Sequence, residues 1–224
     1  MFKSIIFDMD GVIIDSEPIH FKVEKKLFKN LGLVIPDEEH HSFVGTVSRE
    51  TWLYIKDKYK LNQSIEELVE MEGVSYMDCL LSQENIKPIP GVTELIEELR
   101  RNNVKLVVAS SASIKNIETV LQMFNLEKFF ETKISGDEVN NGKPAPDIFL
   151  YAVKIIGAEP EECIVIEDSK NGVEAAKSAG MKCIGFENPN SGKQDLSSAD
   201  MVINSFSEIN YQKLRQIYEQ WQKD

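Results

Sequence analysis

The segment Lys3-Ser4-Ile5-Ile6-Phe7-Asp8-Met9-Asp10-Gly11 predicts the fold and points to a site. Its short apolar run, rich in β-branched residues, is typical of a buried strand in a parallel sheet. Ligands of open α/β sheets bind beyond the carboxyl ends of the strands, so Asp8 and Asp10 are expected to face such a crevice. On position alone, a pair of aspartates that shape a loop or cap a helix is slightly favoured over a ligand site.

Five further segments resemble this strand in length and apolar character. They are Lys105–Ser110, Thr132–Ser135, Cys163–Asp168, Lys182–Phe186 and Met201–Asn204. Helical patterns occupy the chain between and after them, at Val92–Arg101, Ile114–Phe124, Pro146–Ile156, Gly172–Ala179 and Glu208–Gln222. The alternation predicts an α/β protein with a Rossmann-like, doubly wound parallel sheet that begins with Lys3–Asp8.

One stretch interrupts the alternation, because residues 16–87 have helical periodicity and little strand signal. Its borders, Ser16-Glu17-Pro18 and Lys87-Pro88-Ile89-Pro90-Gly91, contain residues that favour defined turns. We therefore expect a core domain of residues 1–15 and 88–224, with an inserted α-helical cap domain of residues 16–87. Within this insert, His40 and His41 are expected to lie in a loop.

Composition restricts the partners that the protein can have. The 37 Asp and Glu residues exceed the 25 Lys and Arg residues, and the net charge of −12 argues against binding to nucleic acid or to an anionic membrane. No apolar run approaches the ~20 residues that cross a bilayer, so a cytoplasmic protein is expected, and we expect a monomer. The three cysteines, Cys79, Cys163 and Cys183, lack metal-ligand spacing and are expected to be free thiols.

A second acidic pair strengthens the functional interpretation of the first. Glu167 and Asp168 end an apolar strand just as Asp8 and Asp10 do. If both strands are parallel, four carboxylates can face one crevice, and a hard cation with oxygen ligands, Mg²⁺ before others, is the economical explanation. Capping of the following helix is the alternative role for Asp168.

The other strand ends add groups suited to phosphate. Ser110, followed by Ser111, offers a hydroxyl and backbone N–H groups just before a helix, although serines in such places often serve only as caps. Lys143, in Gly142-Lys143-Pro144-Ala145-Pro146-Asp147, can reach the same crevice from the loop after the third strand. A surface lysine is the alternative, but a site with four carboxylates and a transferring phosphoryl group needs a cation.

Together, Asp8-Met9-Asp10-Gly11-Val12, Ser110, Lys143 and Glu167-Asp168 resemble the four motifs of the haloacid dehalogenase superfamily. Three wider segments resemble the subgroup that contains β-phosphoglucomutase and sugar-phosphate phosphatases with a helical cap. These segments are Asp15-Ser16-Glu17-Pro18, Gly142–Asp147 and Glu167–Gly172. The resemblance covers nearly the whole chain.

This resemblance implies a role for each motif residue. Asp8 would be the nucleophile that forms an aspartyl-phosphate, and Asp10 the general acid and then the general base. Mg²⁺ would be bound by Asp8, the Asp10 carbonyl and Asp168, with Glu167 supporting the metal site. The name-giving dehalogenases lack a second aspartate at the position of Asp10, so its presence points to phosphoryl transfer.

The chemistry of a carboxylate nucleophile agrees with these roles. Asp8 and a phosphate ester repel each other, so attack requires Mg²⁺ and Lys143 to neutralise the approach while Ser110 holds phosphate oxygens. Asp10 must carry a proton to the leaving oxygen near neutral pH. We therefore expect its pKa to be raised, by the surrounding carboxylates and by cap closure.

Residues of the cap are expected to choose the substrate. The segment Gly45-Thr46-Val47-Ser48-Arg49-Glu50 resembles a loop that β-phosphoglucomutases use against the non-reacting phosphate. Arg49 is its best contact, with an exposed arginine paired to an acid as the alternative. His20 stands where similar mutases place a histidine near the hinge. Trp52 and Tyr76 could contact a sugar ring, but aromatic residues in such an insert more often form its small core.

Three functions remain open: a phosphatase, a phosphosugar mutase, and a non-enzymatic protein that is phosphorylated on Asp8 as a signal. A signalling domain has no use for a lid of ~70 residues. A mutase needs cations for a second phosphate, but no Lys or Arg occurs between Lys60 and Lys87, and Val44 replaces a lysine of the similar mutases. The sequence therefore favours a Mg²⁺-dependent phosphatase for small phosphorylated metabolites, with β-phosphoglucomutase as the alternative.

Overall fold

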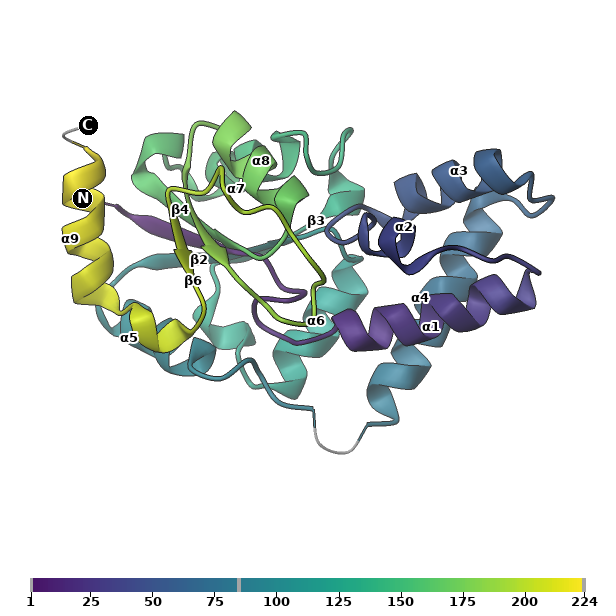
Figure 1. Cartoon of the computed structure of the whole chain (residues 1–224). Coiled ribbons are helices and arrows are strands. Elements are labelled where there is room, and N and C mark those ends of the chain that lie inside the picture. Colours follow the sequence, from purple (N-terminus) through teal and green to yellow (C-terminus); the bar gives the residue numbers. More distant parts are fainter. Residues whose placement is uncertain (1, 84–85, 223–224) are drawn as a thin grey trace.

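A six-stranded parallel sheet forms the centre of the computed structural model, which describes residues 2–83 and 86–222 (Figure 1). Its strands are β1 (Ser4–Phe7), β2 (Lys105–Ser110), β3 (Thr132–Ser135), β4 (Cys163–Glu167), β5 (Lys182–Phe186) and β6 (Met201–Ile203). Their spatial order is β3-β2-β1-β4-β5-β6, with all neighbouring pairs parallel. This is the order of a doubly wound sheet, in which the direction of winding changes beside β1.

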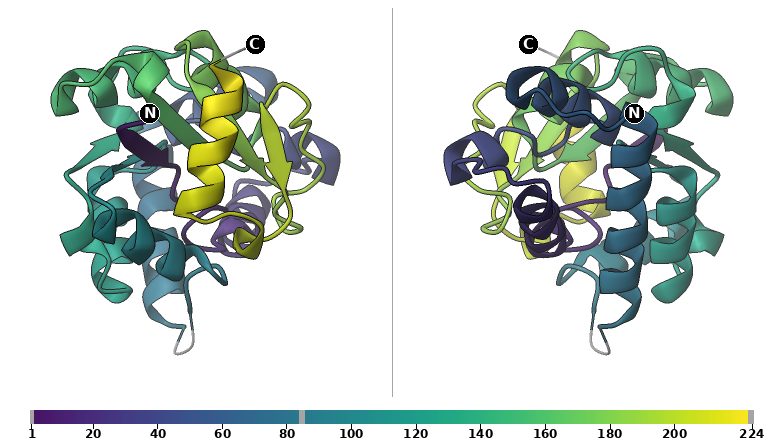
Figure 2. Two further views of the ribbon diagram at one scale, coloured as in Figure 1. Left: turned by 90° about the vertical axis from the view of Figure 1, so that its left-hand side faces the viewer. Right: turned by 90° about the vertical axis from the view of Figure 1, so that its right-hand side faces the viewer.

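Helices cover both faces of the sheet because apolar side chains alternate along the strands. Ile5 and Phe7 of β1 belong to one buried cluster, which includes residues of α5, α6 and α9, whereas Ile6 packs with residues of α7 and α8 (Figure 2). The bounds are α5 Val92–Arg101, α6 Ile114–Met123, α7 Asp147–Ile156, α8 Lys170–Ser178 and α9 Tyr211–Trp221. Four single 3₁₀ turns complete the core, at Glu127–Phe129, Gly136–Glu138, Pro160–Glu162 and Phe206–Glu208.

The insert forms a helical cap opposite the carboxyl ends of the strands, on the right in Figure 1. It contains α1 (Glu17–Asn30), α2 (Asp37–His41), α3 (Ser48–Tyr59) and α4 (Ile65–Leu81). Its interior is apolar, with Trp52, Ile55 and Leu68 wholly or almost wholly buried. The described cap helices thus lie inside the predicted segment 16–87, while the domain borders themselves stay a prediction.

The predicted strands agree with the structure to within one residue at each end, but three helix predictions need correction. The helix expected from Gly172 begins at Lys170, because Ser169 caps it by accepting a hydrogen bond from the backbone N–H of Gly172 at 3.0 Å. Phe206–Glu208 is a separate 3₁₀ turn, so α9 begins only at Tyr211. His40 and His41, expected in a loop, end the short helix α2, and His40 is buried.

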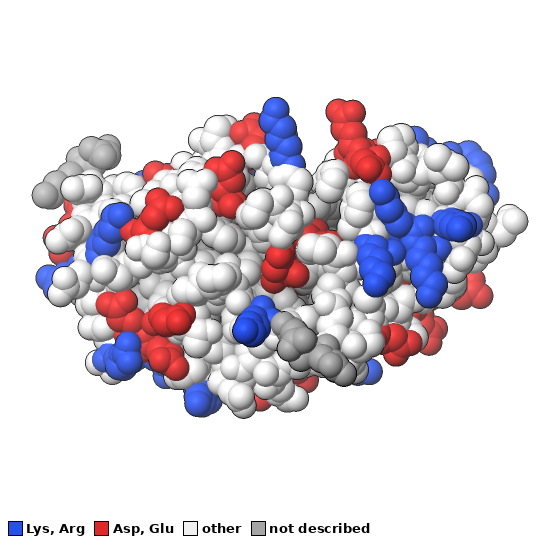
Figure 3. Space-filling model, turned by 60° about the horizontal axis from the view of Figure 1, so that its bottom comes forward, with Lys and Arg blue, Asp and Glu red and all other residues white. Residues whose placement is uncertain are grey.

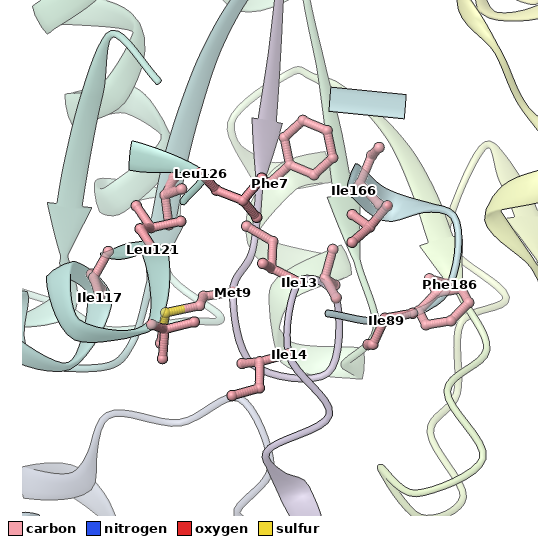
Figure 4. Packing of buried hydrophobic residues seen from close by; sticks show 14 of the residues in the cluster. Phe7, Met9, Ile13, Ile14, Ile89, Ile117, Leu121, Leu126, Ile166 and Phe186 are labelled. Atoms are coloured by element: carbon pink, nitrogen blue, oxygen red, sulfur yellow. The ribbon is translucent and has the colours of Figure 1, made fainter. Parts of the chain in front are cut away.

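The segment after β1 is held in place by apolar packing. Met9, Ile13 and Ile14 are fully buried and belong to the main hydrophobic cluster (Figure 4). The backbone N–H of Ile13 donates to the carbonyl oxygen of Met9 at 2.8 Å. Because Met9 points into the core between Asp8 and Asp10, the loop that carries both acids is anchored rather than free.

The cysteines are free, as the sequence predicts. Cys163 and Cys183 are buried free thiols, and Cys79 is a partly buried one. Among the residues that the structure describes, no helix combines the length and the apolarity needed to cross a membrane.

Candidate active site

Asp8 and Glu167 meet at the carboxyl ends of the adjacent strands β1 and β4. The backbone N–H of Asp8 donates to the carbonyl oxygen of Ile166 at 3.0 Å and so continues the ladder between the strands. A cavity of about 160 Å³ opens over this edge and lies between the core and the cap. From the core it is lined by Asp8, Asp10, Ser110, Ser111 and Asp168, among others.

Lys143 is buried between two of these carboxylates. Its Nζ donates to Asp8 Oδ1 and to Glu167 Oε1, both at 2.6 Å, and to the Ala109 carbonyl oxygen at 3.2 Å. Burial lowers the pKa of Lys143, but the charges of Asp8 and Glu167 outweigh burial and raise it above its ordinary value. With 1% exposure, Lys143 is an internal cation, and the alternative of a surface lysine is wrong.

Glu167 uses both carboxylate oxygens within the protein. While Oε1 accepts from Lys143, Oε2 accepts at 3.0 Å from the backbone N–H groups of Asp168 and Ser169 and from the Ser169 hydroxyl. Gly172 makes room for this arrangement, because a Cβ there would lie 1.8 Å from Glu167 Oε1. Glu167 therefore orients Lys143 and the loop before α8, which is compatible with its predicted supporting role beside a metal.

Asp168 completes a buried acidic cluster with Asp8 and Glu167. One oxygen of each carboxylate lies within 4.8 Å of the others, and Asp168 also accepts a hydrogen bond from Ser191. Ser169, not Asp168, caps α8, so the capping role considered for Asp168 is wrong. The neighbouring Gly11 has φ +75°, and a Cβ there would lie 1.9 Å from Asp168 Oδ2, so only glycine fits.

The cluster fits a divalent cation by its charge and its donor atoms. Burial raises the pKa of Asp8, and repulsion from Glu167 and Asp10 raises it further. The charge of Lys143 lowers it, but the pKa remains well above its usual range. Burial and the charge of Glu167 raise the pKa of Asp168 likewise. The cluster thus contains three buried carboxylates, of which only Asp8 and Glu167 contact Lys143. Hard oxygen donors of this kind suit Mg²⁺. The part of Asp10 in this site, through its main-chain carbonyl, stays a prediction.

Asp10 lies beside the cluster and is held from the cap side as well as from the core. Its Oδ1 accepts from the Ser16 hydroxyl at 2.5 Å and lies 3.5 Å from His20 Nε2, while Oδ2 accepts from the Ser110 hydroxyl at 3.3 Å. Burial would raise the pKa of Asp10, but the hydrogen bond and charge of His20 and the two serine hydroxyls lower it overall.

The lowered pKa of Asp10 differs from the raised one expected from the sequence. The reason is a neighbour 10 residues away in the chain: burial lowers the pKa of His20, but Asp10, Glu17 and Glu24 together raise it to about 10. In this closed arrangement, the proton therefore resides on His20 and Asp10 is its ion-paired partner.

Ser110, the last residue of β2, and Ser111, which follows it, have different surroundings. Besides its contact with Asp10, Ser110 Oγ accepts from the backbone N–H of Ala112 at 3.1 Å, and α6 is capped by Ser113 instead. Ser111 Oγ donates to the carbonyl oxygen of Gly45 at 3.0 Å and so joins the core to a cap loop. Both line the cavity. Their contacts with substrate stay predictions.

The cap closes tightly over this site. Gly45 has φ +77°, and a Cβ there would lie 2.4 Å from Ser169 Oγ on the core side. The backbone N–H of Gly142, next to Lys143, donates to Glu50 Oε1 of α3 at 3.1 Å. Contacts of this kind join the cap to the core beside the carboxylates.

Arg49 and the cap aromatics lie at different depths. Arg49, in the first turn of α3, borders the cavity, but its Nη1 donates to Glu66 Oε1 at 2.9 Å and its side chain is 61% exposed. Trp52 is buried in the cap and does not line the cavity, so its predicted alternative as a core residue is confirmed. Tyr76 does line the cavity and stacks on His20 with ring centroids 4.1 Å apart.

Sequence reasoning missed the acidic side of the cavity. Glu17, Glu24 and Glu72 line it from the cap. A signal was present, because Glu24 follows His20 by four residues and Glu72 precedes Tyr76 by four, which is the spacing of side chains on one helix face.

The doubly wound core, the helical cap and the acidic centre define a class of protein. The haloacid dehalogenase-like hydrolase family matches residues 5–186, so the chain belongs to this family, and it is a phosphatase of the haloacid dehalogenase type.

Three relatives illustrate the likeness. The phosphorylated carbohydrates phosphatase of Thermotoga maritima is 34% identical over 81% of this chain and 83% of its own. The crystal structure of CbbY from Rhodobacter sphaeroides in complex with phosphate has a TM-score of 0.86 at 27% identity, covering 96% of this chain and all of that one. The crystal structure of β-phosphoglucomutase from Clostridium difficile has a TM-score of 0.89 at 25% identity, covering the whole of both chains.

Proposed function

We propose that this phosphatase hydrolyses small phosphorylated metabolites, sugar phosphates among them, through an aspartyl-phosphate on Asp8 and with Mg²⁺ bound at the acidic cluster. The observation that carries the proposal is the buried Lys143 between Asp8 and Glu167, with Asp8 and Asp10 lining one cavity. The likeness to the Thermotoga maritima enzyme supports the substrate class.

Each step has a residue in reach. A carboxylate oxygen of Asp8 forms a bond to phosphorus as the bond from phosphorus to the leaving oxygen breaks. Asp10 passes to that leaving oxygen the proton that it receives from His20, whose Nε2 lies 3.5 Å from Asp10 Oδ1. Water then attacks phosphorus, Asp10 removes its proton, and Asp8 is released. Lys143 remains charged throughout and offsets the repulsion between Asp8 and the phosphoryl oxygens, to which Ser110 donates.

Asp8 and Asp168 are the residues that would hold Mg²⁺, together with the main-chain carbonyl of Asp10 and with Glu167 in support. When bound, the cation supplies electrophilic stabilisation of the phosphoryl charge. The protein supplies the largely buried setting of Asp8, Lys143, Glu167 and Asp168 in which that charge is effective.

Metal removal gives the direct test of this proposal. Phosphate release from a panel of sugar phosphates should fall to background in excess chelator and return with Mg²⁺. Ca²⁺ should fail to restore it, because its longer bonds and higher coordination number would misplace Asp8.

A chelated sample restored with Mg²⁺ serves as the control for irreversible loss. Full activity in excess chelator would contradict the metal assignment. No phosphate release from any ester in the presence of Mg²⁺ would contradict the proposed function.

A phosphosugar mutase is the second candidate, and the likeness to β-phosphoglucomutase favours it. The charge of the cap speaks against it. Helix α4, whose residues Val69, Glu72, Gly73 and Tyr76 line the cavity, carries no Lys or Arg from Ile65 to Leu81. The signalling alternative is not retained, because the chain is a phosphatase of a hydrolase family.

Arg49 separates the two candidates. Arg49 is largely exposed and forms an ion pair with Glu66. Arg49→Ala should therefore raise KM for a small phosphomonoester by at most about tenfold, with little change in kcat. In a mutase the same change would remove a contact needed in both half-reactions. Steady-state phosphate release and conversion of glucose 1-phosphate to glucose 6-phosphate, primed with a bisphosphate, are the two measurements.

Glu66→Ala is the matched control, because it frees Arg49 without removing it, and KM should not rise. Efficient isomerisation by the wild type that collapses in Arg49→Ala would overturn the preference for hydrolysis.

A further inference from the structure

The cap wall of the cavity contains polar atoms that no described residue satisfies. Glu72 Oε2 accepts hydrogen bonds from the Ser48 hydroxyl and, at 2.6 Å, from Trp52 Nε1. No described residue donates to Glu72 Oε1, although the side chain is only 8% exposed and lines the cavity. Glu72 Oε1 is therefore free to accept a hydrogen bond from a donor on a ligand in the cavity.

Neighbouring groups extend this wall. A ring nitrogen of His20 and one carboxylate oxygen each of Glu24 and Glu72 lie within 4.8 Å of one another. The Oε2 atom of Glu24 contacts His40 Nε2. The Tyr76 hydroxyl is buried and has no hydrogen-bond partner within the described part of the chain. The wall therefore offers carboxylate oxygens and a phenol hydroxyl on the cap side of the cavity.

The cations of the cap lie elsewhere. Lys22, Lys25, Lys26 and Lys29 of α1 are all exposed, and Figure 3 shows Lys and Arg side chains gathered on the outer surface of the cap. Of the described cavity-lining residues, only Arg49 at the margin and the histidines His20 and His40 can carry positive charge. His20 is already paired with Asp10, and Arg49 with Glu66.

Charge and hydrogen bonding together restrict the leaving group. Burial raises the pKa values of Glu17 and Glu72 to about 7, so both are mostly ionised above neutral pH. In that range a second phosphate placed against Glu17, Glu24 and Glu72 would meet like charges in a medium of low dielectric constant, which is unfavourable. Hydroxyl or ammonium groups in the same place would donate to the unused oxygens, and hydrogen bonds to charged groups are among the stronger ones.

We propose that Glu72, with Glu24, forms a leaving-group subsite that selects phosphomonoesters rich in hydrogen-bond donors and rejects those with a second phosphate. The inference rests on the proposed function and narrows it, since the substrate class becomes monophosphates of polyols or of amino sugars. Hydroxyl and ammonium groups are two sources of the same donor chemistry, and the experiment distinguishes them.

The test compares kcat/KM for four esters with that for para-nitrophenyl phosphate, which has no donor on its leaving group. The esters are glucose 6-phosphate, glucosamine 6-phosphate, glucose 1,6-bisphosphate and 2-phenylethyl phosphate. In the wild type, kcat/KM for the better donor-rich monoester should exceed that for the bisphosphate and for the phenylethyl ester by at least about tenfold each. A higher value for glucosamine 6-phosphate than for glucose 6-phosphate identifies ammonium as the donor, and the reverse identifies hydroxyl.

Two ratios of kcat/KM are followed in the variants: donor-rich monoester to bisphosphate, and donor-rich monoester to phenylethyl ester. In Glu72→Gln, which keeps the shape and one acceptor, both ratios should shrink at least about fivefold, chiefly through a higher KM for the donor-rich ester. Glu24→Gln should act in the same direction and keeps the test valid if the first variant is unstable in thermal melting. Glu70→Gln, an exposed residue of the same helix, is the matched control and should leave every ratio unchanged.

Two contrary results can be told apart. Ratios near unity in the wild type, or ratios that both Glu72→Gln and Glu24→Gln leave unaltered, would overturn this inference while leaving the phosphatase proposal standing. Absence of turnover on all five esters would overturn the proposed function, and the inference with it.

Discussion

Asp8→Asn is expected to reduce phosphate release by at least about a thousandfold, because an amide cannot form the phosphorylated intermediate. The fold should persist. Asp8 is 6% exposed and its pKa is raised by burial before all else, so loss of its charge removes a repulsion from Glu167 and Asp10. The Asn oxygen can still accept the hydrogen bond that Lys143 gives to Asp8 Oδ1.

Steady-state phosphate release and thermal melting are the two measurements for Asp8→Asn. A matched control is Asp15→Asn, which alters a nearby aspartate outside the described cavity lining. If Asp8→Asn kept more than a few per cent of wild-type turnover at full substrate saturation, Asp8 could not be the nucleophile.

Asp10→Asn should slow hydrolysis of a sugar phosphate by about 10²–10⁴-fold, the usual contribution of general acid–base catalysis. The loss should depend on the leaving group. The aryloxide of an aryl phosphate can leave without a proton. Transfer of the phosphoryl group from an aryl phosphate to Asp8 should therefore suffer far less than transfer from a sugar ester.

Pre-steady-state release of para-nitrophenolate measures the first transfer to Asp8 separately from the second step. In Asp10→Asn a rapid burst followed by slow turnover is expected, since water attack on the aspartyl-phosphate still lacks its base. Equal losses in the burst with the aryl ester and in the first transfer with the sugar ester would show that Asp10 is not the acid.

Much of the core and of its site was predictable from local patterns. Apolar runs such as Ile5-Ile6-Phe7 favour buried strands, and carboxylates at their ends gather at one edge when the strands are parallel. The proximity of Asp8, Glu167 and Asp168 also requires that β1 and β4 be neighbours, which only the structure shows. Helix ends were less predictable, because capping depends on single side chains such as Ser169 and Asn210.

The cap side of the cavity was less accessible to sequence reasoning. For Arg49 the sequence left open a contact with substrate and pairing to an acid, and only the structure identifies that acid as Glu66, 17 residues further along the chain. Glu72 attracted no attention as one glutamate of several in an acidic stretch. The proposed subsite role of Glu72 rests on its burial against Trp52 and on the cavity beside it. Both depend on how α3 and α4 pack.

The sequence by itself determined the order of strands and helices, the acidic strand ends and the presence of a helical insert, because these depend on periodicity and on neighbours in the chain. Only the tertiary structure decided the charge state of the groups in the cavity. Lys143 contacts Asp8 across 135 residues, and His20 reaches from the cap to lower the pKa of Asp10. Electrostatic interactions depend on distance and burial in space, and neither can be read from spacing along the chain.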